Sequence, residues 1–195
     1  MEVTFYGLSF VTEPGVVFTP RPATERLVAA ALDEIDDRPL RVADVGTGAG
    51  VVAIALAVHA SAADIWATDT SVSAIRLARV NAERHDVAER VHVRLGNLLE
   101  PIDPPLDLIT ANLPYLPDAL RGLEEYEAEP ETAVYAPARG LAHYDRLLEC
   151  AEERLTPEGV ILIQFHREIL TSDRDGLAGL RARLERIQSA QWVAS

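Results

Sequence analysis

The chain is short of the residues that build cross-linked, membrane-spanning or metal-binding proteins. Its single cysteine, Cys150, excludes an internal disulfide and lies in an apolar helical run, where a packing thiol is expected. No cysteine and histidine cluster has the spacing of a zinc site, and no apolar run approaches the roughly 18 residues of a membrane helix. The N-terminal sequence lacks the pattern of a signal peptide. We therefore expect a cytoplasmic protein that binds neither a membrane nor a metal.

Basic residues are scarce as well. Lys and Arg number 18 against 31 Asp and Glu, so the formal net charge is -13. Because a phosphate backbone is bound mainly through Lys and Arg, this balance disfavours a nucleic-acid partner. Five glutamates between residues 124 and 131 are interpreted as a solvated loop, and the five histidines form no catalytic constellation. The 195 residues suffice for one globular domain.

The first 20 residues are predicted to form an extended or hairpin segment, in which FYGLSFV and VVFT flank the turn signal Glu13-Pro14-Gly15. Pro22 then lies in the first turn of a helix whose apolar residues from Leu27 to Ile35 share one face. Apolar strands and helices alternate from there on. The expected elements are strands at 40–46, 64–69, 90–96, 106–112 and 160–165, and helices at 50–60, 72–85 and 141–155.

This alternation predicts an α/β, Rossmann-like fold with a mostly parallel central sheet and helices on both faces. The expected division is a segment over 1–20 and the main domain over 21–195. A last helix is expected to carry Leu177, Leu180, Leu184 and Ile187. Only the tail QWVAS remains for another strand, so the sheet is expected to be shortened at its C-terminal edge.

A glycine-rich turn, DVGTGAG, joins the first strand of this alternation to its helix. Glycines at every second position let the chain turn sharply and let a ligand approach the backbone at a helix N-terminus. Asp69 ends the next strand about 20 residues further on, where an acid accepts hydrogen bonds from ribose hydroxyls in nucleoside-binding folds. A plain tight turn and an Asp69 that caps the following helix are the alternatives. The pair favours a nucleoside cofactor.

Two further polar residues follow strands. Asn97 could hydrogen-bond an adenine edge or could simply form a turn after Gly96. Asn112 begins Asn-Leu-Pro-Tyr at the end of a buried strand, the place where ligands of open α/β sheets collect. Its side-chain oxygen and the Leu113 carbonyl can accept two hydrogen bonds from one planar NH₂ group, which Tyr115 could pack against. An Asn that caps the turn is the alternative.

With these motifs, residues from about 5 to 165 resemble the HemK/PrmC family of class I S-adenosylmethionine-dependent methyltransferases, which methylate the glutamine side chain of peptide-chain release factors. FYGLSF with PRPATE resembles the family's lead-in, ADVGTGAG its cofactor loop, GNLLEP its third motif and NLPYLP its NPPY signature. YEAEP and GLAHYDRLL resemble the stretch that follows. Leu113 stands in place of the first proline and Asn97 in place of the usual Asp. We expect no counterpart of the helical N-terminal domain of bacterial members.

The resemblance implies S-adenosyl-L-methionine as cofactor, with the glycines along its methionine part, Asp69 at the ribose and Asn97 at the adenine. The implied cofactor site comprises Asp44, Gly46, Thr47, Gly48, Gly50, Asp69, Thr70, Asn97, Leu98 and Asn112. The implied acceptor site comprises Asn112, Leu113, Pro114 and Tyr115.

The function expected from the residues and the resemblance is methyl transfer to a protein glutamine amide, with a release factor as the implied protein substrate. The alternatives are transfer to an exocyclic amino group of a base, transfer to a small-molecule amine, and an inactive cofactor-binding subunit. An unidentified partner subunit could also replace the missing domain. The net charge argues against the nucleic-acid alternative.

Overall fold

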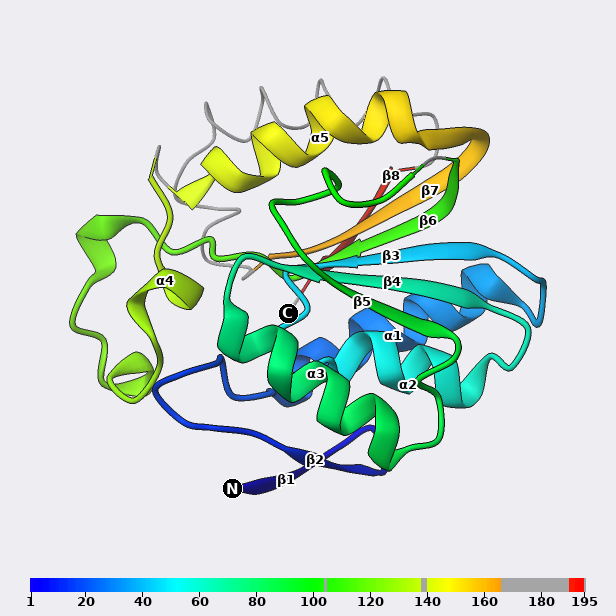
Figure 1. The fold of residues 1–195 in the computed structure, drawn as a ribbon. Coiled ribbons are helices and arrows are strands. Elements are labelled where there is room, and N and C mark those ends of the chain that lie inside the picture. Colours follow the sequence, from blue (N-terminus) through cyan, green and yellow to red (C-terminus); the bar gives the residue numbers. More distant parts are fainter. Residues whose placement is uncertain (104, 138–139, 166–189, 195) are drawn as a thin grey trace.

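A computed structural model describes residues 1–103, 105–137 and 140–165 and the backbone of 190–194 (Figure 1). In this part of the chain, six parallel strands form the central sheet in the order β5-β4-β3-β6-β7-β8. The strands are β3 (Arg41–Val45), β4 (Asp64–Asp69), β5 (Val91–Leu95), β6 (Leu106–Ala111), β7 (Leu155–Phe165) and β8 (Ala190–Ala194). The strand order reverses between β3 and β6, and ligands of open α/β sheets bind at such a switch point.

Helices cover both faces of the sheet, as expected (Figure 1). On one face lie α1 (Pro22–Ile35), α2 (Val51–His59) and α3 (Val72–Arg84), which share a core cluster with Val42, Ile65 and Leu108 of the strands. On the other face, α5 (Ala142–Arg154) shares a second cluster with Ala43, Ile109 and Ile163. Because successive strand residues point to opposite faces, a strand between two helical layers must be apolar throughout, which explains the unbroken apolar strands of the sequence.

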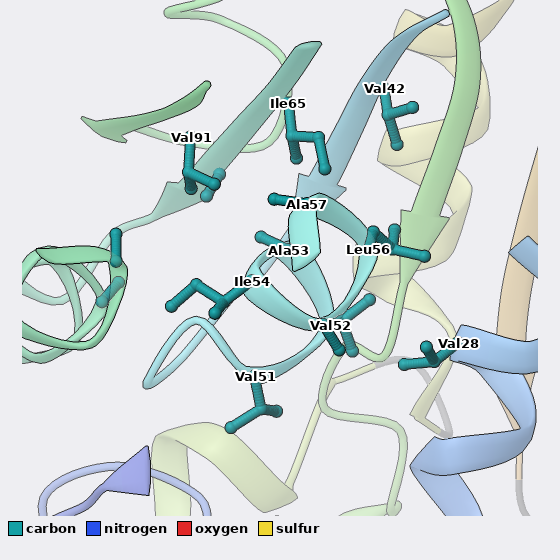
Figure 2. Packing of buried hydrophobic residues seen from close by; sticks show 14 of the residues in the cluster. Val28, Val42, Val51, Val52, Ala53, Ile54, Leu56, Ala57, Ile65 and Val91 are labelled. Carbon is teal, nitrogen blue, oxygen red and sulfur yellow. The ribbon is translucent and has the colours of Figure 1, made fainter. Parts of the chain in front are cut away.

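Helix α2 lies at the centre of the first core. Every residue from Val51 to Ala57 is buried, so this helix has no polar face. Figure 2 shows α2 between the sheet, represented by Val42 and Ile65, and Val28 of α1. None of the described helices is long and apolar enough to cross a membrane.

The N-terminal hairpin turns at a different place from the predicted one. Strands β1 (Glu2–Phe5) and β2 (Leu8–Val11) are joined by Tyr6 and Gly7, both with positive φ, whereas Glu13-Pro14-Gly15 turns only after β2. Positive φ at both central residues is the geometry that matches the twist of a two-residue hairpin. The Asn81 carboxamide of α3 fixes the end of β2, since it bonds both the N–H and the C=O of Val11.

The tail that the sequence left for one further strand does form a strand. Residues of the tail form β8, which runs parallel to β7 and pairs with it from Ile161 to Phe165. The helix predicted around Leu177 to Ile187 lies outside the described residues.

A buried acid at the end of β3 positions the turn that follows. The Asp44 carboxylate is 2% exposed and accepts hydrogen bonds from Thr47 Oγ1 at 2.6 Å, Thr110 Oγ1 at 3.0 Å and Ala53 N at 3.3 Å. It therefore connects β3, the glycine turn, α2 and β6. Burial raises the Asp44 pKa from 3.8 to about 6 despite these bonds, which by themselves would lower it.

The raised pKa predicts a pH dependence of stability. The folded state holds the Asp44 proton more tightly than the unfolded chain, so this contribution is fully present below pH 4 and is lost as pH rises through about 6. Relative to Asp44→Asn, the wild-type free energy of unfolding should fall by up to about 3 kcal/mol between pH 4 and pH 7. Urea denaturation of both proteins at several pH values measures this. Parallel curves would contradict the raised pKa.

Candidate functional site

A cavity of about 210 Å³ lies at the carboxyl ends of the central strands. The turn after β3, the end of β4 and the segments after β5 and β6 form one side of it. The described loop that contains η1 (Asp118–Leu120), η2 (Glu124–Tyr126) and α4 (Glu131–Val134) lies beside this strand edge (Figure 1). The predicted residues that line the cavity are Gly46, Gly48, Asp69, Thr70, Asn97, Leu98, Asn112, Leu113, Pro114 and Tyr115.

Three predicted residues do not line the cavity. Asp44 and Thr47 belong to the glycine turn, but their side chains are buried, and Thr47 donates to Asp44. Gly50 faces α3, where an added Cβ would lie 3.1 Å from Ala78. Gly48, in contrast, has φ of +56° and open space where a Cβ would be, so a ligand can reach its backbone. The alternating glycines thus serve two purposes, close helix packing and an open cavity wall.

Asp69 ends β4 as predicted, but the alternative role considered for it, the cap of the following helix, falls to Ser71. The two Asp69 carboxylate oxygens accept hydrogen bonds from Gly48 N at 2.9 Å and Ser71 N at 2.8 Å, which ties the glycine turn to the start of α3. The helix itself is capped by the Ser71 side chain, which accepts from Ala74 N. Burial raises the Asp69 pKa above its usual value. The Thr70 backbone N–H also bonds this carboxylate, which still has acceptor capacity for a ligand hydroxyl.

Asn97 borders the same cavity from the end of β5. Its NH₂ group donates to the Glu100 carboxylate at 2.9 Å, which leaves the side-chain oxygen as an acceptor. Its neighbour Leu98 is 8% exposed and has φ of +50°, so a strained turn sets the direction of this segment.

Asn112, directly after β6, is held from outside the cavity. Its Nδ2 donates to Thr24 Oγ1 of α1 at 3.1 Å. The next residue, Leu113, donates its N–H to the Tyr144 hydroxyl of α5 at 3.0 Å. The same hydroxyl lies 2.8 Å from Gln164 O and 3.3 Å from Leu113 O. A phenol has only one hydrogen, so we assign the donated bond to the nearer Gln164 carbonyl.

The Leu113 side chain joins the two halves of the cavity. A Cβ added to Gly46 would lie 2.6 Å from Leu113 Cδ2, so the leucine occupies the space that the glycine leaves open. Pro114 and Tyr115 continue the wall, and the Tyr115 ring lies 6.0 Å from the Phe165 ring. Burial keeps the pKa of Tyr144 well above its usual value, so this hydroxyl stays protonated.

The remaining wall was not predicted. It is formed by Val16, Val17, Phe18, Leu116, Tyr126, Pro130, Thr132, Ala133, Val134 and His143, together with Val45, Thr68, Ser71 and Ala74 near the predicted residues. Arg21 connects the two main segments of this wall, residues 16–18 and the loop that contains Tyr126. The guanidinium lies 5.3 Å from the Phe18 ring and 4.7 Å from the Tyr126 ring, and it bonds Glu125 O at 2.7 Å. Two stretches of this wall stand out in the sequence, the apolar VVFT and the family-like YEAEP, but neither was assigned to the site.

His143 is the one histidine among the cavity residues given above. It is half-buried, and burial together with the nearby Arg146 lowers its pKa, so the imidazole is neutral near pH 7. Within the described ranges, no three His, Cys, Asp or Glu side chains are grouped so that they could hold a metal ion.

The chain is similar in sequence and in fold to known methyltransferases. The family model described as "Ribosomal protein L11 methyltransferase (PrmA)" matches residues 8–126. Curated relatives are named release factor glutamine methyltransferase. That of Chlorobaculum tepidum is 34% identical over 86% of this chain and 61% of its own length, and that of Geobacter sulfurreducens is 39% identical over 83% and 57%. That of Coxiella burnetii is 33% identical over 90% and 69%. The chain thus spans roughly three fifths of the first two.

Solved structures show the same fold. The ribosomal protein L11 methylase of Lactobacillus delbrueckii subsp. bulgaricus has a TM-score of 0.58 at 23% identity, over 90% of this chain and 72% of its own. The hMettl16 catalytic domain has a TM-score of 0.64 at 18% identity, over 92% and 66%. Together with the curated relatives, these likenesses confirm the predicted Rossmann-like fold. The chain therefore belongs to the family of S-adenosylmethionine-dependent class I methyltransferases to which the release factor glutamine and L11 methyltransferases belong.

Proposed function

We propose that this chain binds S-adenosylmethionine and transfers its methyl group to the side-chain amide nitrogen of a protein glutamine. The observation that carries the proposal is that Asp69 and Gly48 line the same cavity as Asn112 and Leu113. A site for a nucleoside and a pair of acceptors for a planar NH₂ group thus share one space. The names of the curated relatives support a release factor as the protein substrate.

The residues of the first half of the cavity fit this cofactor. The open backbone of Gly48 accommodates a ligand in close approach, and the Asp69 carboxylate can accept ribose hydroxyls. The Asn97 side-chain oxygen, left free by the bond to Glu100, can accept from an adenine amino group. The Asn at this position therefore keeps the acceptor of the Asp that the family usually has, without its charge. The cofactor supplies a methyl group activated by a sulfonium.

The chain's contribution to the chemistry is to hold the acceptor. An amide nitrogen is a poor nucleophile because its lone pair is delocalised, so two acceptors that fix both hydrogens can orient it for attack. Asn112 Oδ1 and the Leu113 carbonyl provide these acceptors in the proposal. The Leu113 carbonyl remains available because the Tyr144 hydrogen is donated to Gln164. The ring of Tyr115 offers a surface for the planar amide.

The leucine in place of proline is accommodated by contacts that proline could not make. The Leu113 N–H donates a hydrogen bond to the Tyr144 hydroxyl, and the leucine side chain fills the space beside Gly46. In the proposal, these contacts replace the rigidity of a proline ring. Transfer to a nucleic-acid base is less favoured, because Glu125 and Glu129 belong to the cavity-side loop and the chain as a whole carries a charge of -13.

Cofactor binding is tested first, by calorimetric titration with S-adenosylmethionine and S-adenosylhomocysteine. We expect micromolar affinity, about 8 kcal/mol, for the wild type. Asp69→Ala should weaken this affinity at least about tenfold, because the ribose loses its hydrogen-bond acceptor and Gly48 of the glycine turn loses its bond to Asp69. Asp64→Ala is the matched control, since Asp64 begins the same strand and does not line the cavity. Equal affinity of Asp69→Ala and wild type would contradict the assignment of Asp69.

The acceptor half is tested with Asn112→Ala. Transfer of labelled methyl groups to a bacterial release factor should fall at least about 100-fold, the usual effect of removing one group that orients or stabilises the reacting centre. Binding of S-adenosylhomocysteine should stay within about threefold of wild type. If Asn112→Ala instead weakened S-adenosylhomocysteine binding by the same factor as it lowered methyl transfer, the division into a cofactor half and an acceptor half would be refuted.

The contribution of Leu113 is tested by Leu113→Pro, which writes the NPPY signature into this chain. The variant should lower the free energy of unfolding by about 1–3 kcal/mol, because the buried Tyr144 hydroxyl loses its donor and the space beside Gly46 loses its side chain. Leu113→Met keeps the N–H and the volume, and should cost less than about 1.5 kcal/mol. Thermal or urea unfolding measures both. A more stable proline variant would show that the turn does not depend on the Tyr144 contact.

A further inference from the structure

Thr24 of α1 contacts the proposed acceptor site from the side of Asn112 that faces away from the cavity. It lies in the first turn of α1 and is 4% exposed, and its hydroxyl accepts from Asn112 Nδ2 across 88 positions of the chain. Thr24 is not among the residues that line the cavity. The contact therefore acts on the back of the Asn112 side chain, not on a ligand.

The start of α1 brings this hydroxyl to the sheet. Pro22 sets the first turn, and Thr24 N donates to Arg21 O at 2.9 Å. Thr24 is then one of the buried residues of the helix, along with Leu27 and Val28. Residues three and four positions apart share one face of a helix, so the hydroxyl lies on the apolar face that packs on the sheet.

The neighbouring strand places a buried polar residue beside Asn112 in the sheet register. β6 and β7 pair Thr110 with Leu162 and Ala111 with Ile163, so continuing the register by one residue places Gln164 beside Asn112. Gln164 is 2% exposed, and in the described part of the chain its Oε1 has no hydrogen-bond partner. The Asn112 NH₂ group instead donates to Thr24 Oγ1, which accepts this hydrogen bond on the side away from the cavity.

We propose that Thr24 is a positioning residue for the reaction, because its hydroxyl holds the NH₂ end of the Asn112 carboxamide and so keeps Oδ1 directed at the acceptor nitrogen. This inference rests on the proposed function. The terminal torsion of an Asn side chain is broad and nearly two-fold, so without a partner its two ends exchange. The exchanged form would present NH₂ to the substrate NH₂, and two donors cannot bond each other.

The test compares Thr24→Val, which keeps the shape and removes the hydroxyl, with Thr24→Ser, which keeps the hydroxyl. Thr12→Val is the matched control, because Thr12 is 1% exposed and its hydroxyl has no hydrogen-bond partner among the described residues. With S-adenosylmethionine and a release factor as acceptor, Thr24→Val should lower kcat about 10- to 100-fold. KM and the affinity for S-adenosylhomocysteine should change less than about twofold. Thr24→Ser and Thr12→Val should stay within about threefold of wild type.

A second readout needs no acceptor. In ¹⁵N NMR spectra of the full chain, the side-chain NH₂ pair of Asn112 is assigned by its absence in Asn112→Ala. Thr24→Val should move this pair toward the positions of a solvated amide and speed its hydrogen exchange, whereas Thr24→Ser and Thr12→Val should leave it in place. An unmoved pair in Thr24→Val would overturn the inference.

The two readouts separate the possible failures. If the wild type methylates no glutamine in the release factor, the proposed function fails, and the NMR pair still decides whether Thr24 orients Asn112. If Thr24→Val weakens S-adenosylhomocysteine binding as much as it lowers kcat, Thr24 serves the cofactor site or the fold, and the inference is wrong. An unchanged kcat alongside a shifted NMR pair would also overturn it, because orientation would then have no catalytic effect.

Discussion

A buried carboxylate connects the two strands that carry the two halves of the cavity. Asp44 at the end of β3 accepts from Thr110 of β6 and, on the other side, from Thr47 of the glycine turn. The turn leads to the cofactor half and β6 leads to Asn112, so this network sets the distance between the proposed methyl donor and acceptor. Burying this carboxylate is costly, as its raised pKa shows, and the three hydrogen bonds that it accepts offset part of that cost.

Hydroxyl groups support the acceptor half in a comparable way. Thr24 and Tyr144 are both buried and reach Asn112 and the Leu113 backbone from helices on opposite faces of the sheet. Helix packing on both sides therefore determines the geometry of a turn that has only one proline. A small shift of α1 or α5 would lengthen the hydrogen bonds to Asn112 or Leu113 before it disturbed the apolar packing, because hydrogen bonds tolerate little displacement.

The sequence predicted the features that depend on local chemistry. Apolar runs located the strands, glycine spacing located the turn at Gly48, and Asp69 was placed correctly at a strand end on the cavity. The hairpin turn at Tyr6 was missed because its sequence lacks the usual Asn-Gly signal, and the proline signal nearby was stronger. Thr24, Phe18 and His143 were missed as contributors because their positions come from packing between segments far apart in the chain, which no periodicity records. Gly50 was grouped with the cofactor residues by its spacing, and the structure adds a packing reason for this glycine, since an added Cβ would meet Ile54 and Ala78.

The two segments joined by Arg21 differ in kind from the rest of the site. They are joined by the cation–π pairs and the ion pair of Arg21, by a hydrogen bond from Thr19 N to the Glu129 carboxylate, and by Phe18, which packs on a small apolar cluster of Leu116, Tyr126 and Val134. The strands beneath are held by two larger apolar cores. This wall rests on a smaller buried cluster than the strands do, so we expect it to open locally at a lower free energy. The side-chain hydrogen bonds of Asp44, Asp69 and Asn112 described above do not involve Phe18, Tyr126 or Glu129, so a displacement of the wall leaves these bonds intact. Because the Glu129 side chain is 5% exposed, added salt screens its pair with Arg21 less than it would screen a pair on the surface, so this wall should depend only weakly on ionic strength.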